Sequence, residues 1–285
     1  MVYDEQLKIL IDSALKEDIG DGDHSTLSCI YSDTEGRAVL KIKQDGVLAG
    51  VEVAKKIFTY KYPGSVFTAF KKDGDLMNKD EQAFEVLSKV HTILKCERLV
   101  LNCMQRMSGI ATLTRKYIEK IAMYKTRILD TRKTTPNFRL LEKEAVRIGG
   151  ADNHRFGLYD MIMLKDNHID YCGSIEKAIN RAYDYVLESK PALKIEIEAR
   201  NINDVQTIIT HGKNKVFRIM LDNFTPADIS QALKLINGLF ETEASGGITL
   251  DNIEEFAKTG VDYISIGALI HQATSVDLSL KAVSL

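Results

Sequence analysis

The second half of the chain repeats one unit, an apolar strand-like run followed by an amphipathic helix. The apolar runs end near six positions, which are Leu129, Leu164, Ile197, Leu221, Ala244 and Ile266. Helical periodicity begins after all but the last of them, near Phe138, Ser174, Ile202, Thr225 and Leu250. Such a sequential repeat predicts a parallel sheet, and the spacing of 22 to 33 residues between later repeats is typical of a (β/α) barrel. Because six strands are short of the eight in a closed barrel, we expect an open or incomplete (β/α) barrel, with a doubly wound sheet as the alternative.

The first half of the chain follows a shorter period. An amphipathic helix covers Leu7 to Leu15 and ends before Gly20. Strand-like runs cover 38–42, 46–50, 66–70 and 83–90 and are separated by glycine turns. One helix is predicted between them, over 53–60. Strands interleaved with few helices favour a small α+β layer.

A long helical pattern joins the two halves. It covers 91–107, is interrupted at Ser108-Gly109 and resumes over 110–123. We therefore place the domain boundary near Gly109, with a small α+β domain over residues 1–108 and a barrel domain over 109–275. The C-terminal tail, residues 276–285, is expected to pack on the first domain.

Composition excludes several classes of partner. A net charge of -2 argues against nucleic acid and anionic membranes as general partners. No run approaches the roughly 18 apolar residues of a membrane span, and acidic residues interrupt the N-terminal helix, unlike a signal peptide. The four cysteines lack CxxC spacing, which favours a reducing compartment. We predict a soluble, cytoplasmic protein.

Polar or glycine-rich elements follow the strand-like runs at the point where each run ends. They are Asp130 with Arg132 and Lys133, Lys165 with Asp166, Glu198, Asp222, Ser245-Gly246-Gly247, and Gly267. The carboxyl ends of barrel strands form one rim, where the ligand site is built. Glycine turns on the last two strands commonly hold a phosphate with backbone N–H groups. The sequence thus predicts an acidic pair, a basic cluster and a phosphate-binding loop at one rim.

The basic cluster is concentrated between Asp130 and His168. Its members are Arg132, Lys133, His154, Arg155 and Lys165. Positive charge at the ends of buried strands predicts an anionic ligand, and guanidinium groups suit carboxylates and phosphates because their donors form a planar fork.

Each of these residues also has an ordinary structural interpretation. Glu196 and Glu198 alternate on one face of a strand-like run and could pair with Lys194. Asp222 could cap the helix that begins near Thr225, and His271 could likewise cap a helix. His154 could be an ordinary loop histidine, and Arg98 a solvated helix charge.

Seven ordered motifs resemble the quinolinate phosphoribosyltransferase family, also called carboxylating nicotinate-nucleotide pyrophosphorylases. They are EDIGDGDHST (Glu17 to Thr26), ERLVLNCMQRMSGIAT (Glu97 to Thr112), DTRKTTP (Asp130 to Pro136), GGADNHRFGL (Gly149 to Leu158), LKDNHI (Leu164 to Ile169), LDNF (Leu221 to Phe224) and SGGI (Ser245 to Ile248). The resemblance covers nearly the whole chain. It implies a type II phosphoribosyltransferase with an N-terminal α/β sandwich and an open α/β barrel.

The resemblance also implies an activity and an assembly. Such enzymes join quinolinate to 5-phosphoribosyl 1-pyrophosphate (PRPP) with Mg²⁺, releasing pyrophosphate and carbon dioxide and forming nicotinate mononucleotide for de novo NAD synthesis. They work as homodimers or larger assemblies of dimers, such as hexamers, with active sites shared between subunits.

Residue roles follow from motif position alone. The resemblance implies that quinolinate is bound by Arg132, His154, Arg155 and Lys165, together with Arg98 from the partner subunit. It implies that PRPP is bound by Lys133, Glu198, Asp222, Ser245, Gly246, Gly247, Ser265, Ile266, Gly267 and His271. Lys133, Glu198 and Asp222 are the implied catalytic residues. Mg²⁺ would be held mainly through PRPP, with Glu198 and Asp222 as candidate ligands.

Two departures from the family pattern and two rival functions are open at this point. Asn137 stands where glycine is common, although asparagine tolerates left-handed backbone, and the loop at 211–215 is longer than usual. One rival is a related phosphoribosyltransferase for another base, such as the molybdenum-transport-associated relatives. The other is a non-catalytic phosphate- or nucleotide-binding barrel, for which two carboxylates beside the ligand would have no use.

Overall fold

The computed structural model describes residues 2–283, so residues 1 and 284–285 of the two predicted domains lie outside the described part. The chain forms two compact units. The first combines Met1–Arg115, Thr134–Gly150 and Leu269–Leu285, and the second combines Lys116–Lys133 with Ala151–Ala268. Each unit is thus built from separate stretches of the chain. The predicted domain boundary, between residues 108 and 109, lies inside helix α4 (Val90–Lys120).

The predicted interruption of this helix at Ser108 and Gly109 is wrong, because α4 continues through both residues. The Ser108 hydroxyl accepts a hydrogen bond from the Ala49 amide at 2.9 Å and donates to the Ala49 carbonyl at 3.1 Å. A side chain at Gly109 would come within 2.1 Å of the Thr274 carbonyl oxygen. The glycine therefore permits a close backbone approach instead of ending the helix.

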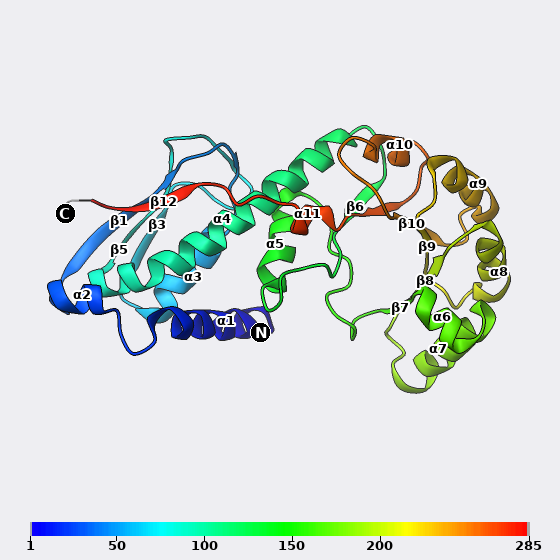
Figure 1. The fold of residues 1–285 in the computed structure, drawn as a ribbon, viewed down its shortest axis with the longest axis horizontal. Helices are drawn as coiled ribbons and strands as arrows, with labels where there is room; N and C mark the ends of the chain where they lie inside the picture. The colour runs from blue at the N-terminus through cyan, green and yellow to red at the C-terminus, as the bar shows by residue number, and fades with distance from the viewer. Residues whose placement is uncertain (1, 284–285) are drawn as a thin grey trace. The chain divides into compact units, whose positions relative to one another are not determined.

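The first unit is built on an antiparallel sheet, with the order β12-β1-β5-β3 among the described residues (Figure 1). Its strands are β1 (Glu35–Ile42), β3 (Val66–Ala69), β5 (Gln82–Lys89) and β12 (Leu278–Val283), beside a ribbon of β2 (Gly46–Val47) and β4 (Leu76–Met77). The C-terminal strand β12 pairs with β1 over its whole length. The strand predicted over 46–50 is shortened to β2, because Gly50 has a φ of 98° and caps the following helix.

Helices α1 (Val2–Ile19), α2 (His24–Cys29), α3 (Val51–Lys61), most of α4 and α5 (Arg139–Gly149) also belong to the first unit. α1 buries Leu7, Ile11 and Leu15, as its helical period predicts. α5, predicted as the first helix of the βα repeat, groups with this unit and not with the parallel sheet. A side chain at Gly149 would come within 2.8 Å of the Ala111 carbonyl oxygen, so the end of α5 packs closely on α4.

The second unit is a parallel sheet with the order β6-β11-β10-β9-β8-β7. Its strands are β6 (Arg127–Leu129), β7 (Ile162–Leu164), β8 (Ile195–Ala199), β9 (Arg218–Asp222), β10 (Glu241–Ser245) and β11 (Tyr263–Ser265). Its helices are α6 (Asp166–Cys172), α7 (Ile175–Ser189), α8 (Ile202–Gly212), α9 (Pro226–Ile236) and α10 (Ile253–Ala257), and α11 (Ala268–His271) begins at its last residue. All six predicted strands are confirmed. Within the described residues β6 and β7 form the two edges, as expected for an open barrel.

The two faces of the parallel sheet differ in polarity. Ile197, Ile219 and Ala244 share one buried face of the sheet by the register of the strands, and α7, α8 and α9 lie along the outer side of the strands in Figure 1. Because successive side chains point to opposite faces, the inner face carries Glu196 and Glu198 of β8. It also carries Arg218 and Asp222 of β9, Glu243 and Ser245 of β10, and Ser265 of β11. No helix among the described residues is long and apolar enough to cross a membrane.

Candidate functional site

The rim of the parallel sheet brings together Lys165, Glu198 and Asp166, which follow two neighbouring strands. Lys165 comes directly after β7, and its Nζ lies 2.6 Å from Oε1 of Glu198 on β8. The second oxygen of Glu198 accepts the Asp166 amide at 3.1 Å. The Glu198 side chain is only 7% exposed, whereas that of Lys165 is 46% exposed. The lysine is therefore held by a buried carboxylate while its tip stays accessible to a ligand.

The two carboxylates of the predicted acidic pair, Glu198 and Asp222, lie close enough to interact electrostatically. Burial and the Glu198 carboxylate together raise the pKa of Asp222 above its usual range. Asn223 donates its amide to Asp222 at 2.8 Å. Asp222 does not cap α9, whose first turn is capped by Thr225 instead. Two carboxylates that disfavour each other's charge fit a divalent cation such as Mg²⁺, since oxygen ligands suit hard cations.

The glycine turn after β10 lies beside the end of β9. Gly246 has a φ of 97°, and a side chain on it would come within 2.2 Å of the Asn223 side-chain oxygen. The Asn223 amide donates to the Ser245 carbonyl at 2.8 Å, which ties the two strand ends together. Gly247 also has a positive φ, 63°, and its carbonyl accepts the Asn252 amide at 3.0 Å. Only glycine suits position 246. The backbone of this turn therefore lies close to the strand ends that form the rim.

The second predicted phosphate-binding segment, Ser265 to Gly267, follows β11. The Ile266 amide donates to the Leu129 carbonyl at 2.9 Å, so this segment continues the pairing with β6. Ser265 and Ile266 are buried and Gly267 is half-buried. The Ile266 side chain is 2% exposed and belongs to the core, and its amide is committed to Leu129, so this residue is poorly suited to bind a phosphate.

Two arginines of the basic cluster are brought together. Burial and the neighbouring Arg132 guanidinium lower the pKa of Arg155. The Arg155 guanidinium donates to the Met161 carbonyl at 3.2 Å. In the part of the chain that the structure describes, no hydrogen-bond acceptor reaches the buried Nε of Arg132. Two half-buried cations that repel each other predict an anion between them.

His154 lies below this rim. Its side chain is 5% exposed, and its Nε2 lies 3.1 Å from Glu196 and 3.4 Å from Glu243. Although burial alone would lower it, these carboxylates raise the pKa of His154 to about 9. Its Nδ1 lies 2.7 Å from the Arg155 amide nitrogen. The side chain is thus held between the two carboxylates, beside the Arg155 backbone.

A buried charge cluster surrounds His154, and sequence reasoning found only part of it. Glu196 was expected to pair with Lys194, and that interpretation is wrong: Lys194 lies over the Phe217 ring, 3.7 Å from its centroid. Glu196 instead faces Arg218 and His154. Burial and the charge of Glu243 raise the pKa of Glu196 to about 7. Alternating charges in the strands RIMLD and ETEAS were the available signal for Arg218 and Glu243.

Arg98 and His271 belong to the first unit, and both are exposed. Lys133 is exposed too, and its amide donates to the Thr131 hydroxyl at 3.1 Å. Asn137 has a φ of 61°, so it does adopt the left-handed backbone that glycine would. In the longer loop after α8, Asn214 plays the same part with a φ of 64°.

A buried ion pair in the first unit fixes the segment that follows Lys133. The Glu142 carboxylate, 0% exposed, lies 2.9 Å from the Arg106 guanidinium. It also accepts the Thr135 amide at 2.8 Å and the Thr135 hydroxyl at 3.0 Å. Arg106 in turn donates to the Ile270 and Ala273 carbonyls at 2.8 and 2.7 Å. The pair therefore links the TTP segment with the chain after α11.

Replacing Glu142 with glutamine is expected to lower the free energy of unfolding by about 3 kcal/mol, because Arg106 loses its charge partner while remaining largely buried. Urea denaturation of the variant measures this loss. Glu144→Gln is the matched control on the same helix, since its partner Arg147 is 66% exposed and such a pair contributes about 0–1 kcal/mol. Equal losses in the two variants would contradict a special role for Glu142.

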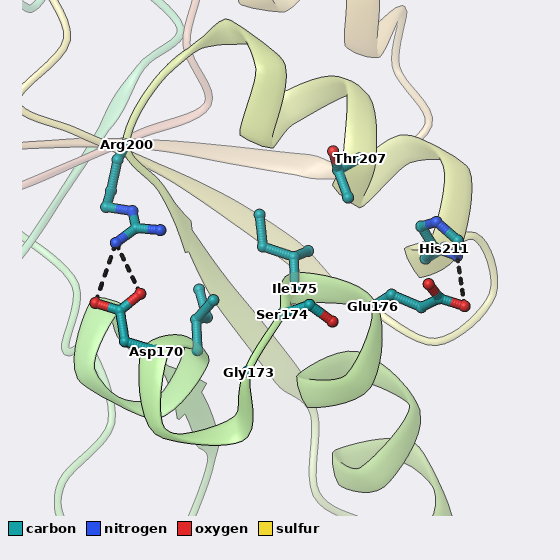
Figure 2. Close-up of a pocket in the computed structure, with 9 residues that line it drawn as sticks. Asp170, Gly173, Ser174, Ile175, Glu176, Arg200, Thr207 and His211 are labelled. Atoms are coloured by element: carbon teal, nitrogen blue, oxygen red, sulfur yellow. Dashed lines mark hydrogen bonds and ion pairs between the residues drawn. The ribbon is translucent and has the colours of Figure 1, made fainter.

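Figure 2 shows one cavity of the second unit. It has a volume of about 430 Å³ and lies between α6, α7 and α8 (Figure 2). Its charged side chains are already paired, Arg200 with Asp170 at 3.0 Å and His211 with Glu176 at 3.7 Å. None of the predicted site residues lines it, so it gives no support to a second ligand site.

Comparison with known proteins matches both halves of the chain to one family. Residues 23–108 match the N-terminal domain of quinolinate phosphoribosyl transferase, and residues 110–281 match its C-terminal domain. A quinolinate phosphoribosyltransferase [decarboxylating] of Nicotiana tabacum is 43% identical, over 96% of this chain and 82% of its own. A probable nicotinate-nucleotide pyrophosphorylase [carboxylating] of Bacillus subtilis is 42% identical, over 96% and 93%. The crystal structure of NadC from Streptococcus pyogenes has a TM-score of 0.90 at 38% identity, covering 98% of both chains. This chain therefore belongs to the quinolinate phosphoribosyltransferase family.

Proposed function

We propose that this chain transfers the phosphoribosyl group of PRPP to quinolinate with decarboxylation, forming nicotinate mononucleotide, pyrophosphate and carbon dioxide. One observation supports this function above the others. A pair of repelling, half-buried arginines lies in the same unit as the Lys165–Glu198–Asp222 cluster and the glycine turn at Gly246. The arginines suit a dicarboxylate, and the carboxylates and glycine turn suit a phosphorylated sugar.

Arg132, His154, Arg155 and Lys165 are the proposed ligands of the two quinolinate carboxylates. The exposed Arg98 would complete the site from a partner subunit, so we propose a homodimer, acting in the cytoplasm. Lys133 would bind pyrophosphate, while Glu198 and Asp222 would contact the ribose. The 5-phosphate would be held by Ser245, Gly246, Gly247, Ser265, Gly267 and His271.

The residue types fit the chemistry of glycosidic cleavage. As pyrophosphate departs, positive charge develops on the ribose, in a transition state that resembles an oxocarbenium ion. Glu198 and Asp222 would stabilise that charge, and Lys133 would stabilise the leaving group. Mg²⁺, held mainly through PRPP with Glu198 and Asp222 as candidate ligands, would neutralise pyrophosphate charge. No protein nucleophile is required.

The deciding experiment measures pyrophosphate release and nicotinate mononucleotide formation from PRPP and quinolinate, with and without Mg²⁺. Both products are expected only with all three present. Asp222→Asn is expected to lower kcat roughly 10²–10³-fold, as expected when one group that stabilises transition-state charge is removed. Asp184→Asn, at an exposed position on α7, is the control and should match wild type.

The same assay separates the rival functions. Pyrophosphate release with another base but not with quinolinate would identify a related phosphoribosyltransferase. Binding of PRPP without release under any condition would identify a non-catalytic phosphate-binding protein. Either result would overturn the proposed function.

A further inference from the structure

The ion pair of Arg106 and Glu142 makes contacts beyond the two helices that carry it. Arg106 lies on α4 and Glu142 on α5, and their nitrogen and oxygen atoms are 2.9 Å apart. Burying such charges is costly, and the two helices already contact each other closely elsewhere. A side chain at Gly149 would come within 2.8 Å of the Ala111 carbonyl oxygen, and Arg115 donates to the Gly149 carbonyl at 3.1 Å. The remaining bonds of the pair therefore decide its role.

Glu142 holds the turn that follows Lys133. Its two carboxylate oxygens accept the Thr135 amide at 2.8 Å and the Thr135 hydroxyl at 3.0 Å. Thr135, Pro136 and Asn137 are all exposed, so apolar burial contributes little to fixing this turn. Hydrogen bonds to an ionised carboxylate are among the stronger ones in proteins. The buried Glu142 carboxylate therefore sets the position of a turn that begins within two residues of Lys133.

Arg106 holds the turn that contains His271. Its Nη2 donates to the Ile270 carbonyl at 2.8 Å, and its Nη1 donates to the Ala273 carbonyl at 2.7 Å. These carbonyls come before and after His271, which is the last residue of α11 and is exposed. The third nitrogen, Nε, donates to Glu142 at 3.0 Å. One planar guanidinium thus joins the carboxylate to the backbone on both sides of His271.

Two simpler roles fit these contacts less well. As a direct ligand of a phosphate, Arg106 would need a guanidinium nitrogen aimed at the ligand, whereas each of its nitrogens already donates to a protein group. As a contact that only holds α4 and α5 together, the pair would need no bonds to other segments. Its other bonds instead end on two turns, and each turn adjoins or contains a residue proposed for PRPP.

We propose that Arg106 and Glu142 form a positioning pair that couples the two phosphate-binding ends of the PRPP site. The pair fixes the turn after Lys133, which is proposed for pyrophosphate, and the turn that contains His271, which is proposed for the 5-phosphate. It contacts neither phosphate itself. The inference rests on the proposed function, because that function assigns Lys133 and His271 their roles. Disturbing either member of the pair is expected to weaken binding at both ends.

Glu142→Gln and Arg106→Lys test this coupling, with pyrophosphate and ribose 5-phosphate as separate competitive inhibitors against PRPP. Glutamine replaces one acceptor oxygen with an N–H donor, and lysine cannot bond the carboxylate and both carbonyls at once. Each variant is expected to raise the KM of PRPP and both inhibition constants roughly 10- to 100-fold, as small displacements of positioned groups do. The Kd of quinolinate, measured by calorimetry, should change far less.

Two further variants separate coupling from a general loss of stability. Thr135→Val removes one hydrogen bond to the carboxylate but leaves the ion pair intact, so inhibition by pyrophosphate alone should weaken. Gln105→Leu is the matched control on α4. Gln105 donates to the Leu278 carbonyl at 3.0 Å, beyond the turn of His271, so its loss should leave the KM of PRPP unchanged. Urea denaturation of all four variants measures the accompanying loss of stability.

Other outcomes would overturn the proposal. An unchanged KM of PRPP in Glu142→Gln, with a lower free energy of unfolding, would make the pair a purely structural contact. Weaker inhibition by ribose 5-phosphate alone in Arg106→Lys would make the two turns independent. Unchanged pyrophosphate inhibition in Thr135→Val would exclude the turn after Lys133, even if the other variants fail to fold.

The proposed function can fail separately, if the wild-type protein releases no pyrophosphate with quinolinate and PRPP. Calorimetric Kd values of pyrophosphate and ribose 5-phosphate then decide. Joint weakening of both in Glu142→Gln and in Arg106→Lys would support the pair. Independent weakening, or no binding of either compound to the wild-type protein, would overturn it.

Discussion

Mixing Arg98→Ala and Lys165→Ala subunits, each almost inactive alone, is expected to restore about a quarter of wild-type activity, since a two-fold dimer with shared sites has one intact site in each mixed pair. The expectation follows from two placements. Lys165 lies at the rim of the second unit beside Glu198, whereas Arg98 is exposed on α4 in the first unit. If Arg98 acts in the partner's site, a mixed dimer contains one site with both groups and one with neither.

Subunit exchange must be verified before activity is compared, for example by native mass spectrometry of differently labelled chains. The matched control mixes Lys133→Ala with Lys165→Ala. Both residues are proposed for one site from one chain, so no mixed dimer can contain an intact site and no recovery is expected. Failure of the Arg98 mixture to recover after complete exchange would exclude action of Arg98 in the partner's site.

Nicotinate is expected to be a poorer substrate than quinolinate by roughly two to four orders of magnitude in kcat/KM. Removing one carboxylate forfeits two charge-assisted hydrogen bonds, each contributing about 1.5–3 kcal/mol. It also leaves Arg132 and Arg155 facing each other with less negative charge between them, and burial already lowers the pKa of Arg155. Steady-state kinetics with both bases and saturating PRPP measure the ratio.

A variant distinguishes this cause from a general preference for the larger substrate. Arg155→Met keeps much of the side-chain volume but removes the charge, so quinolinate should lose far more rate than nicotinate and the ratio should shrink. Comparable turnover of quinolinate and nicotinate by the wild-type protein would contradict a dicarboxylate pocket. An unchanged ratio in Arg155→Met would assign the discrimination to other groups.

Much of the second unit was predictable because its signals are local. Apolar runs ending near Leu129, Leu164 and Ile197 gave the strands, and the carboxyl ends of parallel strands meet at one rim. This rule alone placed Glu198 beside Lys165 and Asp222. The glycine at Gly246 was informative for a similar reason, since a turn that approaches Asn223 so closely admits no side chain.

The predictions that were wrong share a different physical cause. Ser108-Gly109 looked like a helix break, but the glycine accommodates the Thr274 backbone, 165 residues later in the chain. Glu196 was paired with Lys194, two residues earlier, but its partners are His154 and Arg218, and Lys194 lies over the Phe217 ring instead. In both cases the deciding partner is distant in sequence.

The sequence by itself determined the strands, the rim residues and the family, because periodicity and ordered motifs depend on nearby residues. Only the tertiary structure decided which charges meet inside the sheet and how the chain divides. Parallel register sets Glu196 beside Arg218, and burial forces both to find partners. The fold likewise placed β12 beside β1, and α5 with the first unit. His154 shows this most clearly, because it lies between two carboxylates from strands that no local pattern connects to it.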